Sequence, residues 1–251
     1  PAEKGATYSK AMKGLEPDYF ATKDLNLAKV LSWAGKKEEA RVYLERSAGK
    51  MKDNPEVHKM LGGFLLADKR YTEAVKEYTE AVRTSGGDPE MLYSLAVAYS
   101  RAGLRDDAKR AYTEVIDKAP AILEARANLS LTYLEEGNTA QALEILRAAI
   151  KSNPRSPILF GPYALALAIS GKPADALPWM LKSVDAEPGD PTGLYNLAGI
   201  YALLGRNGEA IKTLNQAVDR GYENAAKLDR DPVFASLRDL PEFRALLGRM
   251  R

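Results

Sequence analysis

Side chains that commonly perform chemistry are scarce in this sequence of 251 residues. It has one histidine, His58, and no cysteine. Thiolate catalysis, disulfides and cysteine metal sites are therefore excluded, and a single imidazole removes most zinc-ligand sets. Because His58 has no second imidazole to work with, we expect it to be a partly buried structural side chain without a catalytic or metal-binding role.

Paired acidic residues and paired glycines do not indicate another active site. Glu38–Glu39, Asp106–Asp107 and Glu135–Glu136 fall near expected helix starts or exposed ends, where the helix dipole and solvent account for them. Gly62–Gly63 and Gly86–Gly87 lack a strand-to-helix context and a following Lys-Ser/Thr, so neither is typical of a phosphate loop. We therefore predict no catalytic residues, no cofactor and no metal.

The charge balance also limits the class of partner. The chain carries 36 Lys and Arg against 34 Asp and Glu, and counterion-driven nucleic-acid binding needs clustered positive charge. No apolar run is long enough to span a bilayer. We expect neither a nucleic-acid partner nor a membrane span. The lack of cysteine fits both the cytoplasm and a bacterial periplasm, so the compartment stays open.

An internal repeat organises the chain. An alanine recurs every 34 residues, at Ala40, Ala74, Ala108, Ala142, Ala176 and Ala210. Thirteen residues before these stand Leu27, Leu61, Leu95, Leu129, Tyr163 and Leu197, each followed by a small residue, namely Ala28, Gly62, Ala96, Ser130, Ala164 and Ala198. Four residues after each alanine is a large apolar residue. Several registers that agree over six repeats indicate a repeat architecture.

Each repeat is predicted to be two helices. Apolar residues are spaced by three and four, as in Leu92, Leu95, Ala96 and Tyr99. A glycine suited to a left-handed helix end separates the two helices in five repeats, and Lys69 takes its place in the remaining one. Prolines then stop the second helices: Pro120, Pro154 and Pro188 in register, and Pro55 and Pro89 a few residues later.

The signature of Leu, small residue, aromatic, Ala, aromatic and Pro at this period resembles the tetratricopeptide repeat family. The usual first-helix Trp is absent. The resemblance implies an all-α fold, a right-handed α-solenoid or superhelix of helix-turn-helix repeats. We expect six repeats over residues 19–222, preceded by a partial leading helix over residues 1–18 and followed by a C-terminal helical cap over residues 223–251.

The two ends of the chain depart from the repeat pattern. The stretch Tyr8–Pro17 reads like the second helix of a further repeat, and together with the first residue, Pro1, it suggests a processed or trimmed chain. Two short amphipathic turns follow Asp231 and Leu240, and we interpret them as a cap over the last repeat. Similar tails in this family favour a bacterial origin.

The resemblance implies that the first helices line a concave groove, the usual site for an extended peptide or a partner helix. Projected onto this sequence, the groove-facing residues include Asn26, Lys59, Tyr93, Asn128, Tyr195 and Asn196. The three asparagines share one repeat position, and a row of carboxamides can pair with a peptide backbone. They could equally be ordinary polar surface residues, and the tyrosines could pack along the groove wall instead of binding. The Lys, Asn, Asn, Lys and Arg clamp for chaperone tails is not present.

The fifth repeat suggests a second surface. It places Pro162 and Pro178 inside its two helices, which predicts a late helix start or a kink. Trp179 falls on the outward side of the second helix, in the register of Tyr43 and Ile145, where it could anchor a partner or a second copy on the convex face. Covering a kinked helix is the alternative.

These observations favour a protein-protein interaction scaffold without intrinsic catalysis, which binds its partner in the concave groove. Two alternatives stay open. One is a regulatory or assembly module of a larger protein or enzyme complex, and the other is oligomerisation through the convex face. The sequence does not identify the partner.

Overall fold

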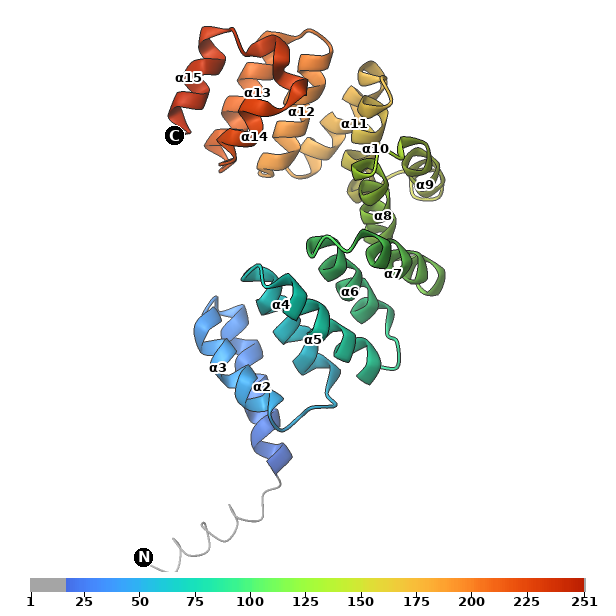
Figure 1. The fold of residues 1–251 in the computed structure, drawn as a ribbon, viewed down its shortest axis with the longest axis vertical. Helices are drawn as coiled ribbons and strands as arrows, with labels where there is room; N and C mark the ends of the chain where they lie inside the picture. The colour runs from blue at the N-terminus through green and yellow to red at the C-terminus, as the bar shows by residue number, and fades with distance from the viewer. Residues whose placement is uncertain (1–16, 251) are drawn as a thin grey trace, which may run out of the picture. The chain divides into compact units, whose positions relative to one another are not determined.

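The computed structural model describes residues 17–250, with side chains from residue 21 onward. In this part of the chain every regular element is a helix (Figure 1). The chain divides after Pro120 into two compact units, which we call the N-terminal and the C-terminal unit. The expected leading helix over residues 1–18 lies almost entirely outside the described residues. No helix among those described is both long and apolar enough to cross a membrane.

The N-terminal unit consists of three helical hairpins, each formed by two successive helices that pack on one another. The pairs are α2 (Pro17–Trp33) with α3 (Lys37–Ala48), α4 (Pro55–Ala67) with α5 (Tyr71–Thr84), and α6 (Pro89–Arg101) with α7 (Arg105–Lys118).

The C-terminal unit contains three further hairpins and a terminal segment. The pairs are α8 (Leu123–Glu135) with α9 (Thr139–Ser152), α10 (Phe160–Ile169) with α11 (Pro173–Ala186), and α12 (Pro191–Leu203) with α13 (Asn207–Asp219). A 3-10 turn, η1 (Pro157–Leu159), precedes α10. The terminal segment consists of α14 (Ala225–Arg230), η2 (Pro232–Leu237) and α15 (Pro241–Arg249). The expected α-solenoid of stacked hairpins is thus confirmed.

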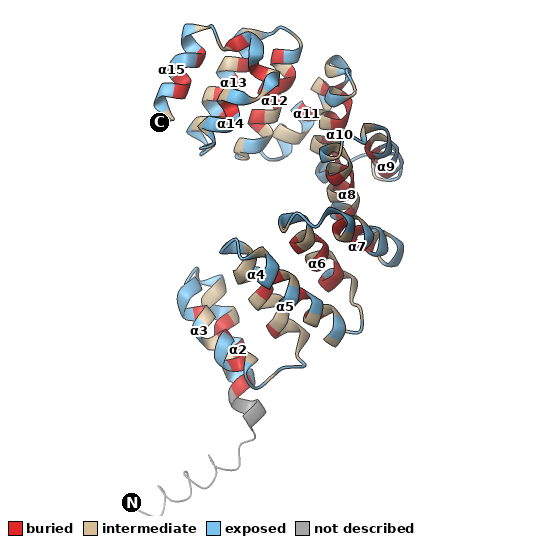
Figure 2. Ribbon diagram, in the orientation of Figure 1, coloured by how far each residue is buried: buried red, intermediate tan, exposed pale blue. Residues whose placement is uncertain are grey.

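The repeat alanines lie in the core of the helix pairs. All six, Ala40 to Ala210 at the 34-residue period, have no exposed surface. The small residue of each first helix is buried as well, and so is the large apolar residue four positions after each alanine. Figure 2 shows buried stretches, in red, recurring in the paired helices. Small side chains allow two helices to approach closely, and the large ones fill the space between hairpins.

The turn between paired helices depends on one left-handed residue. Gly35, Gly103, Gly137, Gly171 and Gly205 have φ between 69° and 80°, as their position after the first helix predicts. Lys69 takes the same conformation with φ 60°, and it is the one non-glycine residue with positive φ among those described. A Cβ atom makes this conformation unfavourable.

Two proline predictions need correction. Pro55 and Pro89 do not end the preceding helices; they begin α4 and α6, after the capping residues Asn54 and Asp88. A proline is well suited to the first helical position, where no backbone N–H is needed. In the fifth repeat, α10 starts late, at Phe160, so that Pro162 lies in its first turn. Pro178 lies inside α11, as expected.

We predict that Lys69→Gly stabilises the protein by about 0.5–1 kcal/mol, because it removes the Cβ from a left-handed residue and only part of the gain is offset by the greater freedom of glycine in the unfolded chain. The urea midpoint followed by circular dichroism measures the change. Gly103→Ala is the matched control at the equivalent turn of the next repeat and should lower the midpoint. A lower midpoint for Lys69→Gly would contradict this account of the turn.

Candidate functional site

The predicted contact residues of the N-terminal unit lie on three first helices. Asn26 is exposed on α2, while Lys59 on α4 and Tyr93 on α6 are half-buried. The Tyr93 ring lies 6.2 Å from the ring of Tyr112 in the paired helix. Tyr93 therefore takes part in packing within its own hairpin.

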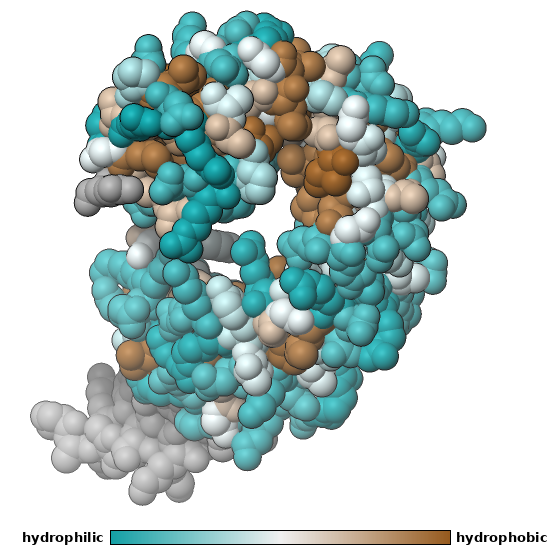
Figure 3. All heavy atoms as spheres, turned by 45° about the horizontal axis from the view of Figure 1, so that its top comes forward, coloured by the Kyte–Doolittle hydropathy of each residue, from teal (hydrophilic) through white to brown (hydrophobic). Residues whose placement is uncertain are grey.

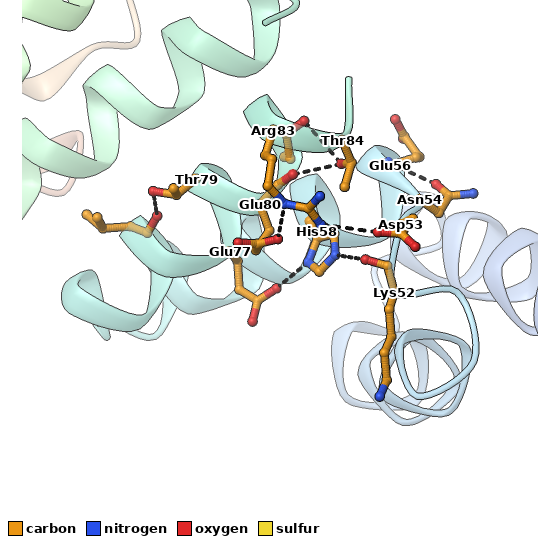
Figure 4. A network of polar contacts seen from close by, with 12 residues as sticks. Lys52, Asp53, Asn54, Glu56, His58, Glu77, Thr79, Glu80, Arg83 and Thr84 are labelled. Atoms are coloured by element: carbon orange, nitrogen blue, oxygen red, sulfur yellow. Dashed lines mark hydrogen bonds and ion pairs between the residues drawn. The ribbon is translucent and has the colours of Figure 1, made fainter. Parts of the chain in front are cut away.

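His58 links three segments of the N-terminal unit. Its Nδ1 lies 2.8 Å from a carboxylate oxygen of Glu77 in α5, and its Nε2 lies 2.7 Å from the backbone carbonyl oxygen of Lys52 (Figure 4). The side chain is only 14% exposed. Both ring nitrogens are thus engaged by acceptors, and each contact is a hydrogen bond when that nitrogen carries a proton. This geometry is that of a structural link between the loop before α4 and helix α5.

Arg83 extends the network around His58. Its guanidinium group donates to Glu80 in the same helix and, at 3.1 Å, to Asp53 in the loop before α4 (Figure 4). Among the described residues no group of three or more His, Asp or Glu side chains could hold a metal ion.

The C-terminal unit contains an apolar groove of about 520 Å³ between α10, α12 and η2. We call it the α10/α12 groove. Its lining residues are Leu165, Ala168, Ile169, Tyr195, Asn196, Gly199, Ile200, Leu203, Asp231, Pro232 and Val233. Ile169 is 57% exposed and Leu203 is 49% exposed, although both are large and apolar. Figure 3 shows apolar surface, in brown, gathered in several places on the face in view.

The terminal segment forms one wall of this groove. Val233 of η2 packs against α12 at Gly199, where an added Cβ would lie 3.4 Å from a Val233 methyl group. Glycine at this position allows the terminal segment to approach the helix closely. The buried side chains Phe234, Leu237 and Phe243 attach the segment to the last hairpin.

Besides Tyr195, two polar side chains line the groove. Asn196 of α12 is half-buried, and its carboxamide has no hydrogen-bond partner among the described residues. The Asp231 carboxylate caps η2, since Oδ1 accepts a hydrogen bond from the backbone N–H of Val233 at 3.0 Å. Its Oδ2 accepts a hydrogen bond from the Tyr195 hydroxyl at 2.5 Å.

Tyr195, for which the sequence allowed either contact with a partner or packing along the groove wall, is buried. It is 5% exposed, stacks on Tyr222 with ring centroids 4.6 Å apart, and meets the Phe234 ring edge-on at 5.3 Å. Burial, and next the hydrogen bond to Asp231, raise the pKa of Tyr195 above its ordinary value. Tyr195 therefore acts in attaching the terminal segment and in holding Asp231, and the burial argues against a direct contact.

The predicted convex-face residues are also partly covered. Trp179 is half-buried between Phe160 and Tyr163 of α10, at ring distances of 5.5 and 5.2 Å, and Lys182 Nζ lies 4.7 Å from its ring. Tyr43 and Ile145 are half-buried, and the guanidinium group of Arg46 lies over the Tyr43 ring. Trp179 therefore covers the irregular fifth repeat and does not project as an open anchor. Asn128 of α8 is half-buried in the C-terminal unit.

The structure adds candidate residues that the sequence interpretation missed. Trp33 is 87% exposed on α2, and it occupies the same repeat position as Ile169 and Leu203, seven residues before the repeat alanine. The groove positions considered from the sequence stopped two residues after the recurring Leu or Tyr. Extending the register by four residues, to the end of the first helix, would have found all three.

Comparison with known protein families gives two matches that overlap along the chain. Two family models described as "Tetratricopeptide repeat" match residues 66–222 and 25–89. No curated protein sequence matched the chain.

Solved structures with a similar fold come from bacteria. A tetratricopeptide repeat protein from Parabacteroides merdae is 16% identical with a TM-score of 0.74, over 99% of this chain and 91% of that chain. A thermophilic protein of the same type from Thermus thermophilus is 23% identical with a TM-score of 0.62, over 78% and 98%. MamA from Desulfovibrio magneticus is 19% identical with a TM-score of 0.52, over 66% and 94%. The bacterial origin is consistent with these sources and stays a prediction.

We predict that stability falls as the pH rises above about 10, because the folded state holds the Tyr195 phenol neutral while the unfolded chain releases the proton near its ordinary pKa of 10.0. The stabilisation is complete below that pH and is lost above it. Urea midpoints between about pH 8 and pH 11 measure the fall. Tyr195→Phe should make the fall shallower, with a remainder from Tyr78 and Tyr222, whose pKa values are also raised by burial. An equally steep fall in this variant would contradict the assignment.

Proposed function

Because the chain belongs to the tetratricopeptide repeat family, we propose that it is a protein-protein interaction scaffold that binds an extended peptide or a partner helix in the α10/α12 groove, without catalysis of its own. Proteins of this family bind protein partners. The proposal assigns no chemical step to His58, since both of its ring nitrogens are engaged within the fold.

The observation that carries the proposal is the exposure of Ile169 and Leu203 beside an apolar groove of about 520 Å³. Exposed large apolar residues next to a concave apolar surface are typical of sites that a partner covers. The small residue Ala168, which also lines the groove, leaves room for a bulky side chain from that partner. Asn196 adds a carboxamide that can donate to and accept from a peptide backbone.

The alternatives receive less support. Oligomerisation through the convex face relied on Trp179, which packs against Phe160 and Tyr163. A regulatory or assembly module of a larger protein would use the same groove, so it differs from the scaffold in context and not in the binding surface.

We predict that Ile169→Ser combined with Leu203→Ser weakens peptide binding at least about tenfold, because both changes remove apolar contact area at the rim of the groove. The probes are peptides selected from a displayed random library on the wild-type protein, and fluorescence anisotropy measures their affinity. The control is Val42→Ser with Leu104→Ser, which changes two similarly exposed residues, 56% and 44% exposed, in the N-terminal unit. If the selected peptides bind the groove variant with wild-type affinity, the α10/α12 groove is not the binding site.

We also predict that Asn196→Ala weakens binding of the same peptides by several-fold while the thermal midpoint stays nearly unchanged, since the carboxamide is half-buried and has no partner among the described residues. Asn26→Ala in the N-terminal unit is the matched control and should leave the affinity unchanged. Isothermal titration measures both variants. Undiminished affinity for Asn196→Ala would remove the carboxamide from the site.

A further inference from the structure

We propose that the α10/α12 groove selects a peptide segment in which a bulky apolar residue lies next to a lysine or arginine, and that Asp231 of the terminal segment binds this cationic group. The inference rests on the proposed function and adds the chemistry of the partner.

The charge distribution in the groove favours this chemistry. Asp231 is the one lining residue that carries a formal charge at neutral pH, and the other described lining residues are apolar apart from Tyr195 and Asn196. Asp231 forms no ion pair within the part of the chain that the structure describes. A carboxylate beside apolar surface attracts a cation more strongly than one fully in water, because the surroundings screen the charge less.

The geometry keeps the carboxylate in place for a partner. One oxygen is fixed by the backbone N–H of Val233 and the other by the Tyr195 hydroxyl, so the group cannot rotate away from the groove. Each oxygen accepts only one of these hydrogen bonds, and a carboxylate oxygen can accept two. A lysine ammonium or an arginine guanidinium can therefore bind without displacing either contact.

Cations of the described part of the chain itself lie near Asp231 without forming an ion pair with its carboxylate, and the Arg238 guanidinium group donates to the backbone carbonyl oxygen of Asp231 at 3.1 Å. Lys227 and Arg230 of α14 line a separate depression that shares only Asp231 and Pro232 with the groove. Lys227 Nζ lies 5.1 Å from the Tyr195 ring centroid. Since none of these cations pairs with it, the Asp231 carboxylate is left for a cation from the partner.

The test compares selections from the same displayed random peptide library on three proteins. On wild type, we expect enriched peptides to carry Lys or Arg next to a bulky apolar residue. On Asp231→Asn, the apolar residue should persist and the basic residue should lose its enrichment. Asp229→Asn removes the same charge from α14 at a residue that does not line the groove, and it should select wild-type peptides.

A second measurement separates charge from packing. For one selected peptide, replacing its basic residue by glutamine should weaken binding to wild type about tenfold and binding to Asp231→Asn very little. Tyr195→Phe removes one of the two hydrogen bonds that hold the carboxylate, so the preference for a basic residue should weaken in this variant but not disappear. If replacing the basic residue of the peptide weakens binding to Asp231→Asn as much as binding to wild type, with the fold of the variant intact by circular dichroism, the charge of Asp231 is not the determinant and the proposal fails.

The outcomes distinguish this inference from the proposed function. Peptides that need Ile169 and Leu203 but show no basic preference would overturn the role of Asp231 and leave the groove as the binding site. Peptides that need neither residue would overturn both. Concentration-dependent self-association that Ile169→Ser with Leu203→Ser abolishes would assign the groove to a second copy of the chain and overturn the separate basic peptide as its occupant.

Discussion

The fold depends on one steric constraint, the close contact between neighbouring helices at a methyl group. Each repeat alanine is fully buried, and the small residue of each first helix is buried beside it. A larger side chain at these points would separate the helices and leave voids around Leu44, Tyr112 and their equivalents, which fill the space between hairpins. Because every repeat meets this constraint in the same register, the hairpins within each unit stack in succession.

Much of the fold could be predicted from the sequence, because the constraint recurs at a fixed period. The alanines, the small residues and the left-handed turn glycines all occupy the places expected for them, and Lys69 takes the strained turn conformation that its position required. The prolines before α4 and α6 were harder to assign. A proline marks both the end of one helix and the first turn of the next, and only the capping side chains of Asn54 and Asp88 distinguish the two.

The candidate site was harder to predict from the sequence, because part of it lies outside the 34-residue repeat. Tyr195 occupies a groove position of the family, but the terminal segment covers it, and nothing in the repeat register gives the position of η2. For Trp179 the repeat register allowed either an outward anchor or a cover over an irregular helix, and only the positions of Phe160 and Tyr163 beside it favour the cover. Ile169 and Leu203 could have been found, since they share a repeat position. Asp231 could not, since it belongs to no repeat.

The α10/α12 groove is built partly by residues of the 34-residue repeats and partly by residues of the terminal segment. The stacked helices supply most of the apolar floor of the α10/α12 groove, while the wall formed by Asp231, Pro232 and Val233 comes from the tail. Residues of the terminal segment are not subject to the close helix-helix packing that keeps the 34-residue pattern constant. Two proteins with the same scaffold can therefore acquire different ligands by exchanging a few residues beyond the last hairpin, and recognition can evolve without altering the frame that supports it.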